Sequence, residues 1–241
     1  MPMNIQPAET IQHSNGETLD VHSMFMTIQG EGPFAGRPAL FIRLAGCNLT
    51  CPLCDTEYTS GRQKIHVADI VSAAQDELSV VYRKLIVITG GEPFRQNLEP
   101  LMRELKDRLP EARIQVETNG KFPPRLGTAI VDIVVSPKTH RVHDLYATFA
   151  PYIRWKYVVD SNVPLDVEGF PTSALGHPLP HGKTLPHPPP GTTVYFQPLD
   201  AKNNAENARN LQAALACVQQ YTWTPHVRVI GQQLHKNLGL E

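Results

Sequence analysis

The sequence predicts a single α/β domain built on a mainly parallel sheet, either open or curled into a partial barrel. Short runs rich in β-branched residues alternate with helical stripes along the chain, which is the pattern of βα units. The 241 residues include 41% hydrophobic and 19% charged residues, enough for one substantial core. Polar motifs follow several predicted strands, and ligands gather at the carboxyl ends of parallel strands.

Six segments are predicted to be buried strands because each is short, rich in β-branched residues and bounded by turn residues. In chain order they are residues 40–45, 85–89, 114–118, 130–136, 154–159 and 193–197. Three further segments carry apolar residues at helical spacing and are predicted to be helices: residues 67–82, 98–109 and 205–221. Cys217 falls in the last of these, so we expect it to be a packed core thiol.

Two segments are expected to lie outside this regular core. Residues 1–20 are polar and are predicted to form a flexible N-terminal tail, followed by one domain over residues 21–241. Residues 162–192 are rich in proline, which disfavours both a helix and a central strand, so they are predicted to form a long loop. Its three histidines are expected to be solvated rather than to bind a metal: His177, His181 and His187.

Composition excludes several classes of protein. The formal net charge of −1 gives no reason to expect a nucleic acid or a membrane surface as partner. No apolar run approaches the length of a membrane span, and the first twenty residues lack the order of a signal peptide. We therefore expect a cytoplasmic protein, whose cysteines stay reduced and available to a metal.

Three of the four cysteines fall within eight residues, as Cys47, Cys51 and Cys54 in the spacing C-x3-C-x2-C. A structural zinc site normally has four protein ligands, and no histidine lies close by. A 4Fe-4S cluster has four irons, so three cysteines leave one iron open to an outside ligand. Two other interpretations remain: a zinc site completed by a distant residue, and surface thiols that bind no metal.

A second motif follows the predicted strand at residues 85–89 and reads Gly90-Gly91-Glu92-Pro93. Two glycines let the backbone approach a ligand closely, and the adjacent carboxylate is suited to accept hydrogen bonds from an ammonium group. The alternative interpretation is a plain turn from strand to helix, capped by Glu92 and Pro93.

These two motifs together resemble those of the radical S-adenosylmethionine (SAM) enzymes. The wider set of motifs resembles the 7-carboxy-7-deazaguanine synthase family in its order along the chain, from about Met24 onward. The motifs that carry this resemblance are Thr27 to Gly32, Gly36 to Ala39, Arg43 to Asn48, Cys54 to Thr56, Thr89 to Pro93, Glu117 to Gly120, Ser136 to Lys138, Gln197 to Asp200 and His235-Lys236.

The resemblance implies a shortened, modified barrel of about six strands with fewer helices, of the radical SAM type. It implies a ring contraction in queuosine or 7-deazapurine biosynthesis, from 6-carboxy-5,6,7,8-tetrahydropterin to 7-carboxy-7-deazaguanine with release of ammonia. SAM bound at the open iron would supply a 5′-deoxyadenosyl radical, and Mg²⁺ would assist. The implied partners are an electron donor such as flavodoxin and a second copy of the chain in a homodimer.

The resemblance also implies roles for individual residues. Cys47, Cys51 and Cys54 would hold the 4Fe-4S cluster, and Thr56 would be the Mg²⁺ ligand that the protein supplies. SAM would lie against Gly91, Glu92, Ser136, Pro137, Lys138, Gln197, Pro198, Leu199 and Asp200. The pterin would contact Ile28, Gln29, Gly30, Glu31, Arg43, Thr89, Glu117, His235 and the chain terminus at Glu241. The guanidinium of Arg43 is suited to the substrate carboxylate, because it donates two parallel hydrogen bonds.

Some of these residues also have plainer interpretations. Thr56 is a residue type found in helix caps and turns, and Arg43 is equally suited to a structural ion pair. The C-terminal run Gln233-Leu234-His235 lacks the threonine usual in the family, and Glu241 stands where a small residue is usual. Two whole-protein alternatives also remain: an activating enzyme for glycyl-radical proteins, and a non-catalytic zinc-binding protein.

Overall fold

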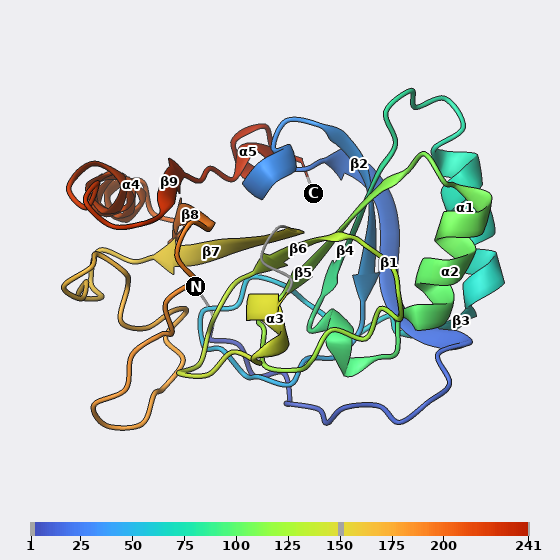
Figure 1. Cartoon of the computed structure of the whole chain (residues 1–241), viewed down its shortest axis with the longest axis horizontal. Helices are drawn as coiled ribbons and strands as arrows, with labels where there is room; N and C mark the ends of the chain where they lie inside the picture. The colour runs from blue at the N-terminus through green and yellow to red at the C-terminus, as the bar shows by residue number, and fades with distance from the viewer. Residues whose placement is uncertain (1–2, 149–151, 241) are drawn as a thin grey trace.

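The computed structural model describes residues 3–148 and 152–240, and its centre is a single open sheet of nine strands (Figure 1). The strand order is β3-β1-β2-β4-β5-β6-β7-β8-β9. Seven strands run parallel to one another: β2, β4, β5, β6, β7, β8 and β9. Strand β1 runs antiparallel to both β2 and β3. The predicted partial barrel with a parallel sheet is therefore confirmed, and the sheet does not close.

All six predicted strands are present, within two residues of the expected bounds. They are β2 (Pro38–Leu44), β4 (Leu85–Gly90), β5 (Arg113–Thr118), β6 (Asp132–Val135), β7 (Ile153–Val159) and β8 (Thr193–Pro198). Three further strands extend the sheet at its two edges: β1 (Thr18–Ile28), β3 (Gln63–His66) and β9 (Val227–Ile230). The expected count of about six is therefore too low, because these edge strands are short or have few β-branched residues.

The three predicted helices are α1 (Val67–Glu77), α2 (Glu99–Arg108) and α4 (Asn204–Gln219). Side chains cap α1 and α4: His66 accepts from the Ala68 amide, and Asn203 accepts from the Glu206 amide. The remaining helices are single turns: α3 (Leu145–Thr148), α5 (Leu234–Asn237) and the 3-10 turns η1 (Gly32–Phe34) and η2 (Pro93–Arg95).

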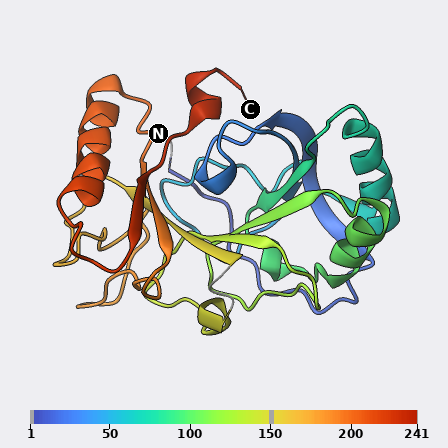
Figure 2. The same cartoon turned by 45° about the horizontal axis from the view of Figure 1, so that its top comes forward.

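Helices α1 and α2 cover one end of the sheet and α4 covers the other, as Figure 2 shows. Cys217 on α4 is fully buried in the core that these helices form with the sheet, so the expectation of a packed core thiol is confirmed. None of the helices among the described residues combines the length and the apolar character that crossing a membrane requires.

Alternation along the strands sorts the side chains into two layers. On β2 and β4, Leu40, Ile42, Ile86 and Ile88 belong to the main core on the helix side. The residues between them face the opposite side, which carries a cavity. Each of the following polar residues comes directly after a buried apolar residue of its strand and lines a cavity on that side: Arg43, Thr89, Glu117, Lys156 and Gln197.

The two segments expected outside the core both contact it. Strand β1 begins at Thr18, so the expected domain boundary after residue 20 falls inside this strand. The preceding N-terminal segment (residues 3–12) hydrogen-bonds to residues 47–58, which contain the three cysteines. Whether the segment is flexible stays a prediction, because flexibility concerns motion.

Residues 162–192 form the expected long loop without a helix, and only an isolated bridge between Leu165 and Pro171 interrupts it. Phe170 anchors this loop, since its fully buried ring packs 5.0 Å from that of Tyr157 on β7. His187 is not simply solvated as expected, because its Nε2 lies 2.6 Å from the Asp166 carboxylate.

Candidate active site

The three clustered cysteines lie on the cysteine loop (residues 46–58), which follows the carboxyl end of β2. All three line one cavity of about 950 Å³, the cysteine cavity. Burial raises the pKa of Cys47 to about 12 and that of Cys51 to about 11, and it also raises the pKa of Cys54. Cys51 is buried and the other two are half-buried, so these thiols ionise poorly alone, and a bound metal would supply the positive charge that thiolates need.

The glycine pair after β4 passes very close to the start of the cysteine loop. Gly90 has φ of +135°, a value that favours glycine, and a Cβ added at Gly91 would lie 2.1 Å from the Gly46 carbonyl oxygen. Gly91 also lines the cysteine cavity. The pair is therefore required for the close contact between two backbone segments beside Cys47.

Glu92 lies beside the cavity and is not one of its lining residues. It is fully buried, and its carboxylate accepts hydrogen bonds from the Phe94 amide, the Thr118 hydroxyl and the Asn119 amide at 2.8–3.0 Å. Burial raises its pKa, although these three donors oppose the shift. These contacts agree with the interpretation of Glu92 as the cap of a turn. The Glu92 carboxylate connects η2 to the loop after β5.

The other residues expected around SAM come from the ends of β6 and β8. Ser136, Lys138, Gln197, Pro198, Leu199 and Asp200 line the cysteine cavity, and Pro137 does not. Lys138 is half-buried, and burial lowers the pKa of its ammonium group to about 8. Its Nζ donates to the Ser136 hydroxyl at 2.5 Å.

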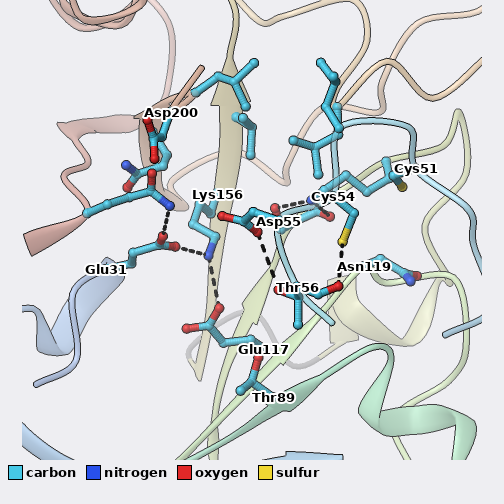
Figure 3. Close-up of a pocket in the computed structure, with 18 of the residues that line it drawn as sticks. Glu31, Cys51, Cys54, Asp55, Thr56, Thr89, Glu117, Asn119, Lys156 and Asp200 are labelled. Atoms are coloured by element: carbon cyan, nitrogen blue, oxygen red, sulfur yellow. Dashed lines mark hydrogen bonds and ion pairs between the residues drawn. The ribbon is translucent and has the colours of Figure 1, made fainter. Parts of the chain in front are cut away.

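Lys156 on β7 binds two carboxylates at the centre of the site, as Figure 3 shows. Its Nζ lies 2.5 Å from Glu31 Oε2 and 3.0 Å from Glu117 Oε2. Burial alone would lower the pKa of Lys156, but the two carboxylates outweigh it and raise the pKa. Gln29 donates to Glu117 at 3.0 Å, and Gln233 donates to Glu31 at 2.8 Å, so both carboxylates are held on two sides.

A second cavity, the arginine cavity, adjoins the first through Glu31, Thr89, Glu117 and Lys156. Most residues expected to contact the pterin line it or its border with the cysteine cavity: Ile28, Gln29, Glu31, Arg43, Thr89, Glu117 and His235. Arg43 lies next to Thr89 in the sheet register, with its guanidinium 5.1 Å from the Phe25 ring centre.

Two of the expected pterin contacts are not among these lining residues. Gly30 does not line either cavity; it packs against His235, whose Nδ1 would lie 1.9 Å from a Cβ at residue 30. Glu241 lies outside the described residues. Thr56, the expected Mg²⁺ ligand, lines both cavities, and its hydroxyl lies 3.4 Å from Asp55 Oδ1.

Sequence reasoning missed several residues of the site. Lys156 could have been found, because a lysine inside the apolar run at 154–159 requires a buried partner. Gln233 and Lys236 come from the C-terminal segment, and Lys236 pairs with Asp55 across the cavity. Leu175 lines the cysteine cavity from the 162–192 loop, and its carbonyl accepts from the Leu53 amide at 3.1 Å. No local sequence signal points to these last three.

Comparison with known proteins identifies the family. No family model matches the chain. A 7-carboxy-7-deazaguanine synthase from Rhodospirillum rubrum is 38% identical over 201 residues, which cover 80% of this chain and 80% of the relative. Another, from Bordetella pertussis, is 30% identical over 244 residues, covering 91% of this chain and 98% of the relative. The chain belongs to the 7-carboxy-7-deazaguanine synthase family.

A solved structure of a protein with this fold is also similar. The crystal structure of QueE from Escherichia coli matches 92% of this chain and the whole of that chain, with a TM-score of 0.62 and 21% identity. This match confirms the radical SAM type of fold. The relatives give no support to the activating enzyme or to the zinc-binding protein, the two whole-protein alternatives to a 7-carboxy-7-deazaguanine synthase.

The donor set of the cysteine cavity fits an iron–sulfur cluster with a ligand. Among the side chains of residues 3–148 and 152–240, no three His, Cys, Asp or Glu groups converge on one point as a single metal ion requires. A cluster makes a different demand, since each thiolate binds a different iron. Among the buried side-chain atoms of the same residues that have no hydrogen-bond partner are Asn48 Nδ2 and Gln197 Oε1. Asn48 Nδ2 is a donor beside Cys47, and Gln197 Oε1 is an acceptor that a ligand would satisfy.

Proposed function

We propose that this chain catalyses the ring contraction of 6-carboxy-5,6,7,8-tetrahydropterin to 7-carboxy-7-deazaguanine with release of ammonia. One observation carries the proposal: three thiols, one buried and two half-buried, and a charged, hydrogen-bonded set of side chains line two cavities that share a border. The first cavity has the ligands for a cluster, and the second has the cation and the amides that a carboxylated heterocycle requires. Membership of the family supports the same reaction.

The cofactors are part of this proposal. Cys47, Cys51 and Cys54 would hold a 4Fe-4S cluster, which together with SAM supplies the radical that begins the reaction. Gly91, Ser136, Lys138 and the segment 197–200 would contain SAM, because they line the cavity that the thiols line. Glu92 would act as a positioning residue that fixes the adjacent turn, since its carboxylate already accepts three hydrogen bonds from the protein.

The residues of the arginine cavity would bind and orient the substrate. Arg43 would face the substrate carboxylate, and Gln29 and Glu117 offer hydrogen-bonding groups to the edge of a pterin. Lys156 would keep Glu31 ionised and would hold both Glu31 and Glu117 in place, so that they accept hydrogen bonds from the substrate without moving. Mg²⁺ would bind at the Thr56 hydroxyl, on the border of the two cavities, with its other ligands from substrate and water.

The expected surroundings of the enzyme stay part of the proposal. A reducing cytoplasm would keep the thiols available, an electron donor such as flavodoxin would reduce the cluster, and a second copy of the chain would form a homodimer. The implied pathway is queuosine or 7-deazapurine biosynthesis.

The test is an anaerobic assay with reconstituted protein, reductant, SAM, Mg²⁺ and the tetrahydropterin, analysed by mass spectrometry. We expect 7-carboxy-7-deazaguanine, and no product with Cys51→Ala. If 5′-deoxyadenosine forms without that product, the radical chemistry stands and the substrate is wrong. If iron and sulfide fail to bind at all, the cluster assignment falls.

A further inference from the structure

The N-terminal segment contacts the cysteine loop beside each of the three cysteines. The Glu9 amide donates to the Cys47 carbonyl at 2.7 Å. Asn4 Nδ2 donates to the Cys51 carbonyl at 3.1 Å. Residues before β1 therefore supply hydrogen bonds to a loop that has almost no regular backbone pairing of its own.

Gln6 makes the contact beside the third cysteine, Cys54. Its Nε2 donates to the Thr56 carbonyl at 2.9 Å, while its Oε1 accepts from the Tyr58 amide at 2.8 Å. One amide side chain thus bridges two backbone groups two residues apart. Gln6 Nε2 and the Gln6 backbone amide also donate to Asn4 Oδ1, each at 3.0 Å, so the two side chains act as one unit.

The far end of the segment is anchored next to the start of the cysteine loop. Glu9 pairs with Arg95 at 3.2 Å and with Arg62 at 2.5 Å. Arg95 is almost fully buried, and its guanidinium donates to the Ala45 carbonyl at 3.0 Å and packs against Gly46. The same arginine therefore connects the segment to the residues that lead into Cys47.

Polar contacts, rather than apolar burial, hold the first part of the segment in place. Met3 and Ile5 leave 68% and 87% of their surface exposed, whereas Asn4 and Gln6 between and beside them point to the cysteine loop. Removing the two amide side chains should therefore loosen the loop locally, with little change in the core.

We propose that the N-terminal segment holds the cysteine loop in its metal-binding shape before a cluster is loaded, with Asn4 and Gln6 as positioning residues. The proposal rests on the proposed function, because it assumes that the three thiols bind a cluster. A loop that is already ordered pays less conformational entropy when its thiols bind irons, so the cluster is retained more firmly.

The first test measures thiol protection in the metal-free full-length chain. The Asn4→Ala/Gln6→Ala variant is alkylated with iodoacetamide, and the modified peptides are quantified over time. We expect the loop cysteines to react about tenfold faster than in the wild type, the factor expected for one or two lost hydrogen bonds. Ile5→Ala is the matched control, and it should react like the wild type.

The alkylation rate of Cys217 shows whether the double substitution loosens the whole fold or only the cysteine loop. Global destabilisation would expose this core thiol together with the others, whereas local loosening of the loop leaves its rate unchanged. The proposal is overturned if the loop cysteines keep their wild-type rates, or if all four thiols speed up by the same factor.

A second measurement separates this proposal from the proposed function. Protein reconstituted with iron and sulfide is exposed to a chelator, and the loss of visible absorbance is followed. We expect the double variant to lose iron at least about fivefold faster than the wild type and Ile5→Ala. A wild type that never loads iron defeats the cluster assignment, whereas a wild type and a double variant that release iron at equal rates defeat only the role of the segment.

Discussion

Replacing Lys156 with Met should destabilise the protein strongly at neutral pH. The substitution keeps the length of the side chain and removes the one cation that lies between Glu31 and Glu117. Lys156 is buried, so the two carboxylates would be left close together with little solvent. Breaking a buried ion pair by removing one partner costs about 3–5 kcal/mol, a large part of the total stability of a domain.

The stability lost in Lys156→Met should depend on pH, and the pKa shift of Glu31 sets the direction of that dependence. In the wild type, burial would raise the pKa of Glu31, but Lys156 and its other partners lower it below 4.5. Its stabilisation is therefore present above pH 4.5 and lost as the pH falls through the lowered value. Lys156→Met removes the largest contributions that oppose burial and leaves only Gln233 and His235, so the pKa of Glu31 should rise and the variant should regain stability as the pH falls from 8 toward 5.

Urea denaturation followed by tryptophan fluorescence measures both effects, because Trp155 is buried next to the substitution. Lys64→Met is the control: Lys64 is 78% exposed on the side chain and pairs with Asp20 at 3.6 Å, so its loss should cost less than about 1 kcal/mol. The reasoning is refuted if Lys156→Met costs as little as the control, or if its cost is the same at pH 5 and pH 8.

Three further substitutions test other parts of the site. Gly91→Ala places a Cβ 2.1 Å from the Gly46 carbonyl oxygen, so the cysteine loop must shift, and iron bound per chain after reconstitution should fall well below the wild-type level. Glu92→Gln leaves an amide group facing a backbone or hydroxyl donor, which should cost about 1–3 kcal/mol in urea denaturation; an unchanged midpoint would contradict its role as a triple acceptor. Phe170→Ala should cost about 3–5 kcal/mol, because the ring is fully buried, and a cost below 1 kcal/mol would show that the 162–192 loop is not anchored there.

The central part of the fold was predictable because its strands are buried on both faces. Such strands read as short β-branched runs, and all six were found. The edge strand β9 has only four residues, and β1 contains Asp20, His22, Ser23 and two methionines, so neither has a strong strand pattern. Their place in the sheet depends on pairing with residues distant in sequence, which composition does not reveal.

The site was predictable where motifs follow strands, as with the cysteines and the glycine pair. It was not predictable where a role depends on tertiary contacts. Two of the partners of Glu92, Thr118 and Asn119, lie 26 and 27 residues away at the end of another strand, and no local pattern in the sequence reveals these contacts. The polar residues at positions 3–12 suggested a tail. In the structure, the side-chain amides of Asn4 and Gln6 donate hydrogen bonds to backbone carbonyls of the cysteine loop.

The order of strands in the sheet has a consequence for how the chain folds during synthesis. From β5 to β9, each strand pairs with the strand that is translated just before it. The N-terminal segment, β1, β2 and the cysteine loop can therefore assemble early, while Gln233, which bonds to Glu31 at the site, is translated after all nine strands. We expect nascent chains arrested before residue 227 to have an ordered cysteine loop with an open site. Pulse alkylation of such chains would show whether the site stays accessible until Gln233 has been translated.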